Sequence, residues 1–80
     1  HYRTSDKKEI DFIVEKTDKI FAIEVKSSQS IKKEAFKHIA DFQKSASKNT
    51  IGIVFYAGDT ILSFSDGPHQ RFALPLNLFF

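Results

Sequence analysis

Two short apolar segments in the first third of the chain carry carboxylate side chains. Asp11 interrupts the run Ile10–Ile13, and Glu24 and Lys26 lie in the run Ala22–Lys26. Two ionised carboxylates about 4 Å apart repel each other by ~4 kcal/mol at an effective dielectric constant near 20, so such a pair needs a raised pKa, open solvent or a bound cation. Mg²⁺ suits two carboxylates because it keeps several of its waters. A neighbouring ammonium can position or polarise a water for attack on phosphorus, so these residue types predict a phosphodiester-hydrolysis site.

A β-hairpin is the element expected to bring these residues together. Residues 9–16 and 19–26 are rich in β-branched and aromatic residues, and Thr17-Asp18 between them favours a turn. Pairing around this turn places Asp11 opposite Glu24, and it places Lys26 opposite Glu9. Side chains alternate across a strand, so all four lie on one face of the predicted sheet.

The other predicted elements follow from periodicity and turn residues. A short strand is expected at 2–4, and polar residues 27–30 lead into a helix at about 31–47, with Ser30 as its N-cap and Asn49 as its C-terminal stop. The continuous apolar run 51–56 predicts a central strand buried on both faces, and 60–64 predicts a further strand. Pro75 is expected to start a terminal helical turn.

The expected order is therefore β-β-β-α-β-β in a mixed sheet. The helix should face the core through four residues at helical spacing, which are Ala35, Ile39, Phe42 and Ala46.

Composition excludes several classes of protein. The chain has 80 residues and contains no cysteine, methionine or tryptophan, which excludes a disulfide scaffold and a thiolate zinc site. No apolar run approaches the ~20 residues of a membrane span, so no membrane partner is expected. The net charge of +2 permits an anionic partner without requiring one. The chain starts at His1 and ends in an apolar run, so we interpret residues 1–80 as one domain that forms part of a longer protein.

Other polar residues have simpler interpretations. The helix lysines Lys32, Lys33, Lys37, Lys44 and Lys48 could reach phosphates, but Glu34 and Asp41 interrupt them and favour a solvated helix face. His38 is better explained as a packing or partly exposed histidine than as a catalytic one. Ser27 and Ser28 suit a connector better than a phosphate site. A Glu-x-Lys pattern is itself common on solvated strands, and only the apolar neighbours of Glu24 favour a functional interpretation.

The runs Glu9–Glu15 and Ala22–Ser28 resemble the PD-(D/E)xK nuclease superfamily, whose restriction-endonuclease-like core has the order αβββαβ. More closely, they resemble the C-terminal domain of unknown function found in prokaryotic AAA+-type ATPases. That domain reads Glu-(Val/Ile)-Asp-Phe, then Glu-Val-Lys-Ser-Ser, and ends in a Pro-Leu segment such as Leu74–Leu76. The resemblance implies that Asp11 and Glu24 bind the metal and that Lys26 is the catalytic lysine.

The chain departs from the superfamily pattern in two ways. Ile10 stands where the superfamily has its nominal proline. Many active members also use an acid from a helix before the first strand, and residues 1–80 contain no such helix, so the expected core lacks the N-terminal helix of the usual order.

The sequence thus predicts a Mg²⁺- or Mn²⁺-dependent DNA endonuclease module. Asp11 and Glu24 would hold the metal, Lys26 would assist the water, and Glu9 would be an outer metal ligand. The expected partners are DNA and an N-terminal ATPase domain of the same chain, with a homodimer also allowed, in the cytoplasm. The alternatives are a catalytically inactive nuclease-like module that binds DNA or protein, and a structural fragment whose acids are simply exposed.

Overall fold

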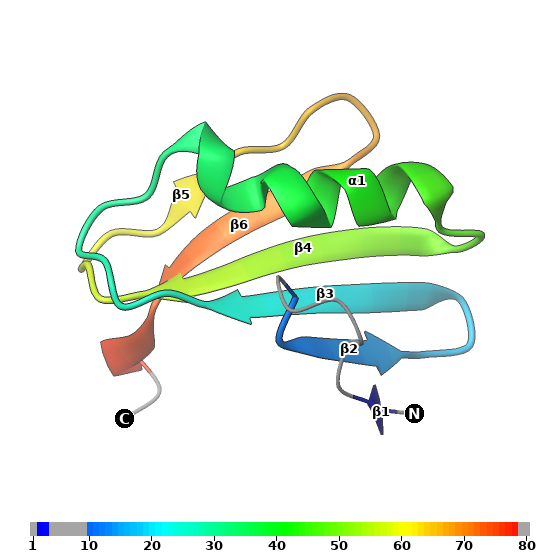
Figure 1. Ribbon diagram of the computed structural model, residues 1–80, viewed down its shortest axis with the longest axis horizontal. Helices are drawn as coiled ribbons and strands as arrows, with labels where there is room; N and C mark the ends of the chain where they lie inside the picture. The colour runs from blue at the N-terminus through cyan, green and yellow to red at the C-terminus, as the bar shows by residue number, and fades with distance from the viewer. Residues whose placement is uncertain (1, 4–9, 79–80) are drawn as a thin grey trace.

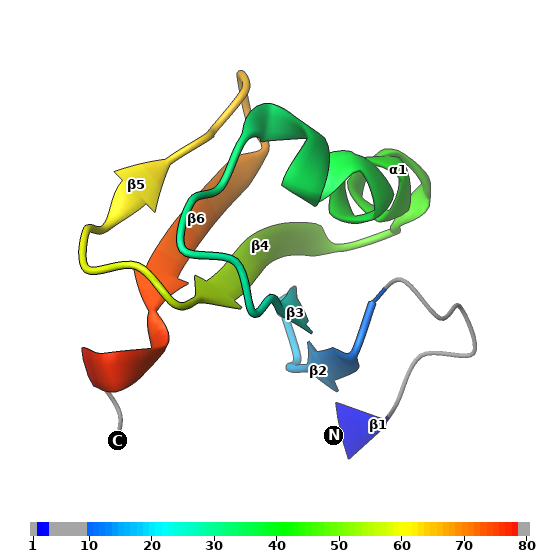
Figure 2. The same ribbon diagram turned by 60° about the vertical axis from the view of Figure 1, so that its left-hand side comes forward.

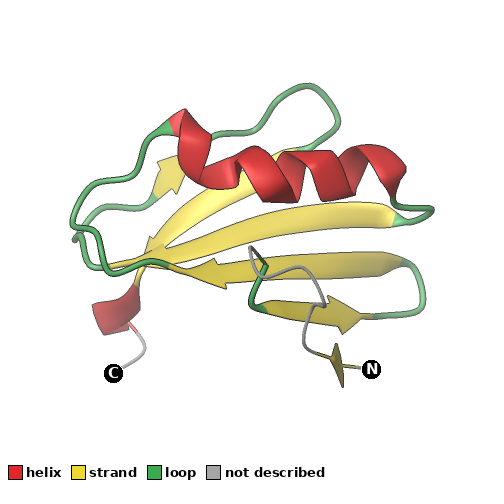
Figure 3. Cartoon of the chain, in the orientation of Figure 1, coloured by secondary structure: helices red, strands yellow, loops and turns green. Residues whose placement is uncertain are grey.

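A computed structural model describes residues 2–3 and 10–78 of the chain, which has a mixed α/β fold. Its six-stranded sheet has the order β1-β2-β3-β4-β6-β5 (Figure 1). The strands are β1 (Tyr2–Arg3), β2 (Phe12–Glu15), β3 (Lys19–Val25), β4 (Asn49–Tyr56), β5 (Leu62–Ser63) and β6 (Gln70–Pro75). The helical segments are the 3₁₀ helices η1 (Lys33–Phe36) and η2 (Leu76–Leu78) and the α-helix α1 (Lys37–Ser45) (Figure 3). Within the described residues, no helix is long and apolar enough to cross a membrane.

The predicted hairpin is confirmed as the antiparallel pair β2–β3. Ile13 pairs with Ala22 and Phe12 with Ile23, which is the register expected for a turn at Thr17-Asp18. The backbone N–H of Lys16 donates to the carbonyl of Lys19 at 2.8 Å and closes this turn. The first strand of the hairpin, β2, is shorter than predicted, since it begins at Phe12.

Three parallel strands form the centre of the sheet. β4 lies between β3 and β6 and is parallel to both, which accounts for its apolar sequence. The strand β6 was not predicted, so the order is β-β-β-α-β-β-β. Pro75 ends this strand, where a proline is tolerated because β5 pairs with β6 only at Ala73 and Phe72. The predicted terminal helical turn is present as η2, but it starts at Leu76 rather than at Pro75.

The predicted helix is shorter and less regular than the sequence suggested. It starts as η1, whose N-cap position is Lys32 with no side-chain hydrogen bond, so the prediction of Ser30 as N-cap is wrong. The buried side chain of Ile31 instead fixes the approach of the chain to the core. The helix ends at Ser45 because Ala46 is already extended, and Asn49 is the first residue of β4 rather than a helix stop.

The core lies between α1 and one face of the sheet (Figure 2). Ile39 is buried, and Ala35, Phe42 and Ala46 pack against the buried core, as their helical spacing predicted. The helix also buries two side chains that the sequence did not single out, Phe36 and Gln43.

Gln43 connects α1 to two strands. Its Nε2 donates to the carbonyls of Thr50 at 2.7 Å and Gln70 at 3.0 Å, while its Oε1 accepts a hydrogen bond from Nε of the buried Arg71 at 2.8 Å. The amide therefore satisfies buried backbone groups of β4 and β6 beneath the helix.

The opposite face of the sheet, here called the open face, is apolar and only half-buried or exposed. It is formed by Val14, Phe21, Ile23, Val25, Ile51, Ile53, Phe72 and Leu74. Ile51, Ile53 and Phe55 are only half-buried, so the prediction that 51–56 is buried on both faces is wrong. Burial in β4 alternates from residue to residue because only one face is covered.

Gly52 allows α1 to approach β4 closely. A Cβ atom added at Gly52 would lie 2.5 Å from Cγ2 of the buried Ile39. We expect Gly52→Ala to lower the free energy of unfolding, measured in urea, by about 1–3 kcal/mol through overpacking. Ile39→Leu removes that methyl group, and it should recover part of the loss in the Gly52→Ala background. An unchanged stability of Gly52→Ala would contradict this packing.

Candidate active site

Glu24 carries a carboxylate that is buried in the sheet. It follows Ile20 and Ala22 on the face of β3 that α1 covers, and only 2% of it is exposed. Neither Oε1 nor Oε2 has a hydrogen-bond partner within the part of the chain that the structure describes. A buried carboxylate in this state is costly, so the position is not explained by the stability of the fold.

Lys26 lies directly beside Glu24. Its Nζ is 3.4 Å from Oε2 of Glu24, and 38% of its side chain is exposed. The backbone N–H of Lys26 donates to the carbonyl of Phe55 at 2.8 Å, which keeps the residue aligned with β4 just beyond the end of β3. The ammonium therefore lies between the buried carboxylate and solvent.

Asp11 reaches the same end of β3 from the neighbouring segment. It lies one residue before β2, and its Oδ2 accepts a hydrogen bond from the backbone N–H of Val25 at 2.8 Å. The carboxylate of Asp11 thus accepts the backbone hydrogen bond of Val25 that a carbonyl of a neighbouring strand would otherwise accept. The charge of Asp11 acts on Glu24, and one oxygen of Asp11 binds the backbone of Val25, whereas the predicted diagonal contact of Asp11 with Lys26 stays a prediction.

The charges around Glu24 act on its protonation. Burial raises the pKa of Glu24 above its usual value of 4.5, the ammonium of Lys26 opposes this rise, and the charge of Asp11 adds to it. His38, on the first turn of α1, also lowers the pKa of Glu24. The site therefore includes a fourth titratable group, from the helix.

The sequence did not single out His38 as part of this site. The structure confirms that it is partly exposed. Its position three residues after Ala35 and four before Phe42 was the available signal, because this spacing places it at the margin of the core-facing stripe.

The raised pKa of Glu24 makes the stability of the fold depend on pH. The folded chain retains this proton above pH 4.5, where the unfolded chain has begun to lose it. The folded state then binds more protons, so the contribution of Glu24 to the free energy of unfolding falls as pH rises from about 4.5 through the raised pKa. Glu24→Gln should remove this decline.

Urea unfolding across this pH range measures the effect. Near pH 8 we expect Glu24→Gln to exceed the wild type in stability, because the amide is neutral at every pH, whereas the wild type loses with rising pH the stability that its retained proton supplies. Two results would contradict the burial of an ionisable Glu24. One is a Glu24→Gln variant that is less stable than the wild type at pH 8, and the other is a variant whose stability falls with rising pH as much as that of the wild type.

The residues present suit a divalent cation. The two oxygens of Glu24 without hydrogen bonds and Oδ1 of Asp11 are hard oxygen donors of the kind that Mg²⁺ and Mn²⁺ prefer. Residues 2–3 and 10–78 contain no group of three or more acidic or histidine side chains that could hold a metal ion. The site as described therefore offers two carboxylates. Glu9, predicted as an outer ligand, lies outside the described residues.

The other candidate residues do not join this site. Lys32, Lys33, Lys37 and Lys44 are exposed, as expected of a solvated helix face. Lys48 instead forms an ion pair with Glu15 at 2.9 Å and donates to the carbonyl of Lys16 at 3.1 Å. Ser27 and Ser28 are exposed in the connector, and the carbonyl of Ser28 accepts a hydrogen bond from the backbone of Ala57.

Comparison with known proteins gives one result. The model of a family described as a domain of unknown function, DUF4143, matches residues 1–79. Neither the curated proteins nor the solved structures contain a match to the chain.

Proposed function

The chain belongs to the DUF4143 family of domains of unknown function, and we propose from the geometry of its site that it is a metal-dependent nuclease-like domain that hydrolyses phosphodiester bonds in DNA. We further propose that it acts as the C-terminal module of an AAA-type ATPase. This agrees with the resemblance of Glu9–Ser28 to such domains.

One observation carries this proposal. Glu24 is 2% exposed, neither of its carboxylate oxygens has a hydrogen-bond partner among the described residues, the ammonium of Lys26 is 3.4 Å from its Oε2, and the charge of Asp11 raises its pKa. A small stable domain rarely maintains an unsatisfied buried acid without a functional reason. A purely structural fragment with exposed acids does not account for the burial of Glu24.

Each residue has a role that follows from its place. Glu24 and Asp11 would hold Mg²⁺ or Mn²⁺. When bound, the ion would stabilise the negative charge that develops on the phosphate. Lys26 extends from the buried carboxylate towards solvent, where its ammonium can orient a water or contact a phosphate oxygen. Protonated Glu24 must lose its proton before it can bind a cation, so binding should strengthen as pH rises.

The restriction-endonuclease-like core is part of the same proposal. Its support is the order of three antiparallel strands, a helix and a parallel strand, with the acidic residues before β2 and near the end of β3.

A second candidate function is an inactive nuclease-like module used for binding. The open face favours it, because a large apolar surface suits contact with another polypeptide. The two candidate functions differ in whether the site hydrolyses DNA.

A cleavage assay separates them. The purified chain is incubated with supercoiled, linear and branched DNA in millimolar Mg²⁺ or Mn²⁺, with chelator as the control. We expect metal-dependent nicking that Lys26→Met abolishes. Nicking that persists in chelator or in Lys26→Met would contradict the proposed site, and no nicking of any substrate would favour the binding module.

A further inference from the structure

A polar hollow lies at the edge of the sheet where the parallel strands β3, β4 and β6 end. Its volume is about 320 Å³, and it is lined by Gln29, Ala57, Gly58, Asp59 and Asn77. Gln29 belongs to the connector after β3, residues 57–59 follow β4, and Asn77 lies in η2, directly after β6 (Figure 1). Ligands of open α/β sheets bind outside the carboxyl ends of the strands, so this hollow is a candidate binding site.

The hollow lies beside the proposed active site, because the pairing of β3 with β4 continues beyond both strands. The backbone N–H of Lys26 donates to the carbonyl of Phe55, and that of Ala57 donates to the carbonyl of Ser28, both at 2.8 Å. The chain from Lys26 to Gln29 spans at most about 10 Å, which three nucleotides of a strand cover at about 3.4 Å each. A DNA strand with a phosphate at Lys26 can therefore place a base in the hollow.

The lining of the hollow suits a nucleobase rather than a phosphate. No lysine or arginine among the described residues lines it, and the carboxylate of Asp59 repels a phosphate. Amide and carboxylate side chains are groups that read base edges through hydrogen bonds. The volume also exceeds the ~150 Å³ of a cavity that holds benzene, whose six-membered ring resembles a pyrimidine in size.

Asp59 determines which base the hollow favours. Gln29 and Asn77 can each present a donor or an acceptor, because an amide carries both. An ionised carboxylate only accepts hydrogen bonds, so Asp59 favours a base edge with an amino group over one with a carbonyl oxygen. Its Oδ1 accepts a hydrogen bond from the hydroxyl of Thr60 at 3.1 Å, which leaves Oδ2 available to a ligand.

Tyr56 fixes the loop that carries Asp59. Its side chain is buried, and its hydroxyl donates to the carbonyl of Thr60. Its ring fills the space beside Gly58, where an added Cβ atom would overlap it. The backbone on both sides of Asp59 is therefore held in place before a ligand binds, which lowers the ordering cost of binding.

We propose that the hollow binds an unpaired base with an exocyclic amino group, such as cytosine, in a single-stranded DNA substrate, and that Asp59 accepts a hydrogen bond from this amino group. Thymine is disfavoured, because it presents a carbonyl oxygen at the same position. The inference rests on the proposed function, since it places the base near a phosphodiester group held at Lys26.

Two single-stranded oligonucleotides of about 12 nucleotides, one of cytosine and one of thymine, test the proposal. Their affinities are measured by fluorescence anisotropy at about pH 8 in chelator, so that no metal-dependent hydrolysis occurs. We expect the wild type to bind the cytosine oligonucleotide about tenfold more tightly, as one good base contact allows.

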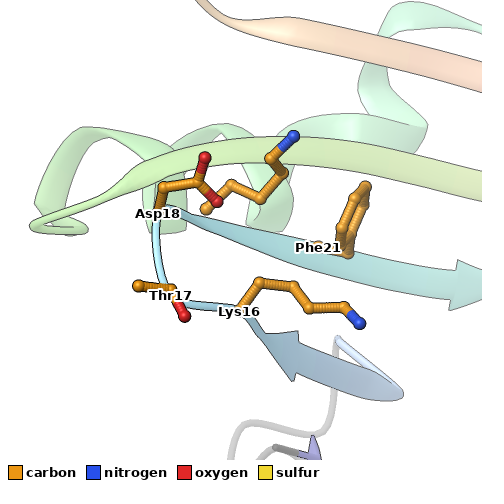
Figure 4. A pocket seen from close by; sticks show the side chains of 5 residues that line it. Lys16, Thr17, Asp18 and Phe21 are labelled. Carbon is orange, nitrogen blue, oxygen red and sulfur yellow. The ribbon is translucent and has the colours of Figure 1, made fainter.

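Asp59→Asn is the decisive variant. The amide keeps the shape of the side chain and can donate to a carbonyl oxygen, so the preference for cytosine should fall to about twofold or less. Asp18→Asn is the matched control, because it changes the net charge equally. Asp18 lines a second hollow, at the β2–β3 turn and the opposite edge of the sheet, so this variant should keep the full preference (Figure 4).

Three results would overturn the inference: equal affinity of the wild type for the two oligonucleotides, no binding of either, or the same preference in Asp59→Asn as in the wild type. Failure of the proposed function is a separate result, because the binding is measured without hydrolysis. A chain that prefers cytosine through Asp59 but never cleaves DNA would support the base site and contradict the nuclease activity. Metal-dependent cleavage without a preference for cytosine would do the reverse.

Discussion

Glu24→Gln is expected to lower the rate of metal-dependent DNA cleavage by more than about 100-fold, since the loss of even an outer partner of a metal ligand costs up to about that factor. The amide keeps the shape of the side chain and its place beside Lys26, but it cannot carry the negative charge that a divalent cation requires. The same substitution is expected to raise stability at pH 8, so loss of activity would occur in a better-folded protein. This opposition between activity and stability is typical of a functional site.

Asp66→Asn is the matched control for this variant. Asp66 is an exposed acid in the turn between β5 and β6, and its neutralisation should leave the cleavage rate within about twofold of the wild type, since surface changes away from a site rarely matter. If Glu24→Gln and Asp66→Asn cleaved equally well, Glu24 would have no part in hydrolysis.

Phe36→Ala should have the largest effect on stability, a loss of about 3–5 kcal/mol in the free energy of unfolding. Phe36 ends η1, is 1% exposed, and has its ring centroid 5.1 Å from that of Phe64. A chain of this length has a total stability of only about 4–12 kcal/mol, so the variant should be largely unfolded at 37 °C. Circular dichroism and urea titration would measure this.

Phe72→Ala makes the matching change on the open face. Phe72 is only half-buried, so its truncation should cost clearly less than that of Phe36. Equal losses for the two variants would show that the open face is as well packed as the helix-covered face.

The parts of the fold that were predicted from the sequence depend on local patterns. Alternation and the Thr17-Asp18 turn predicted the hairpin and its register, and the spacing of Ala35, Ile39 and Phe42 predicted the helix face. The strand β6 was missed because Gln70–Pro75 includes a buried arginine and a proline, both unusual in a strand. Arg71 is accommodated by Gln43, which is 28 residues away, and no local pattern reveals such a partner.

The candidate site was predictable to a similar degree. The register placed Asp11 beside Glu24, and the i, i+2 spacing placed Lys26 on the same face. The hydrogen bond from Val25 to Asp11 was not predicted, because it depends on how β2 ends beside β3. The effect of His38 on the pKa of Glu24 was not predicted, because it depends on the helix lying over the end of β3, which is a tertiary contact.

The most direct test of the account is a calorimetric titration of the chain with Mn²⁺ at about pH 8. We predict measurable binding in the micromolar to millimolar range, and Asp11→Asn and Glu24→Gln should each weaken it strongly while Asp66→Asn does not. No binding at millimolar metal, or binding that Glu24→Gln leaves unchanged, would contradict a cation site built on the buried carboxylate.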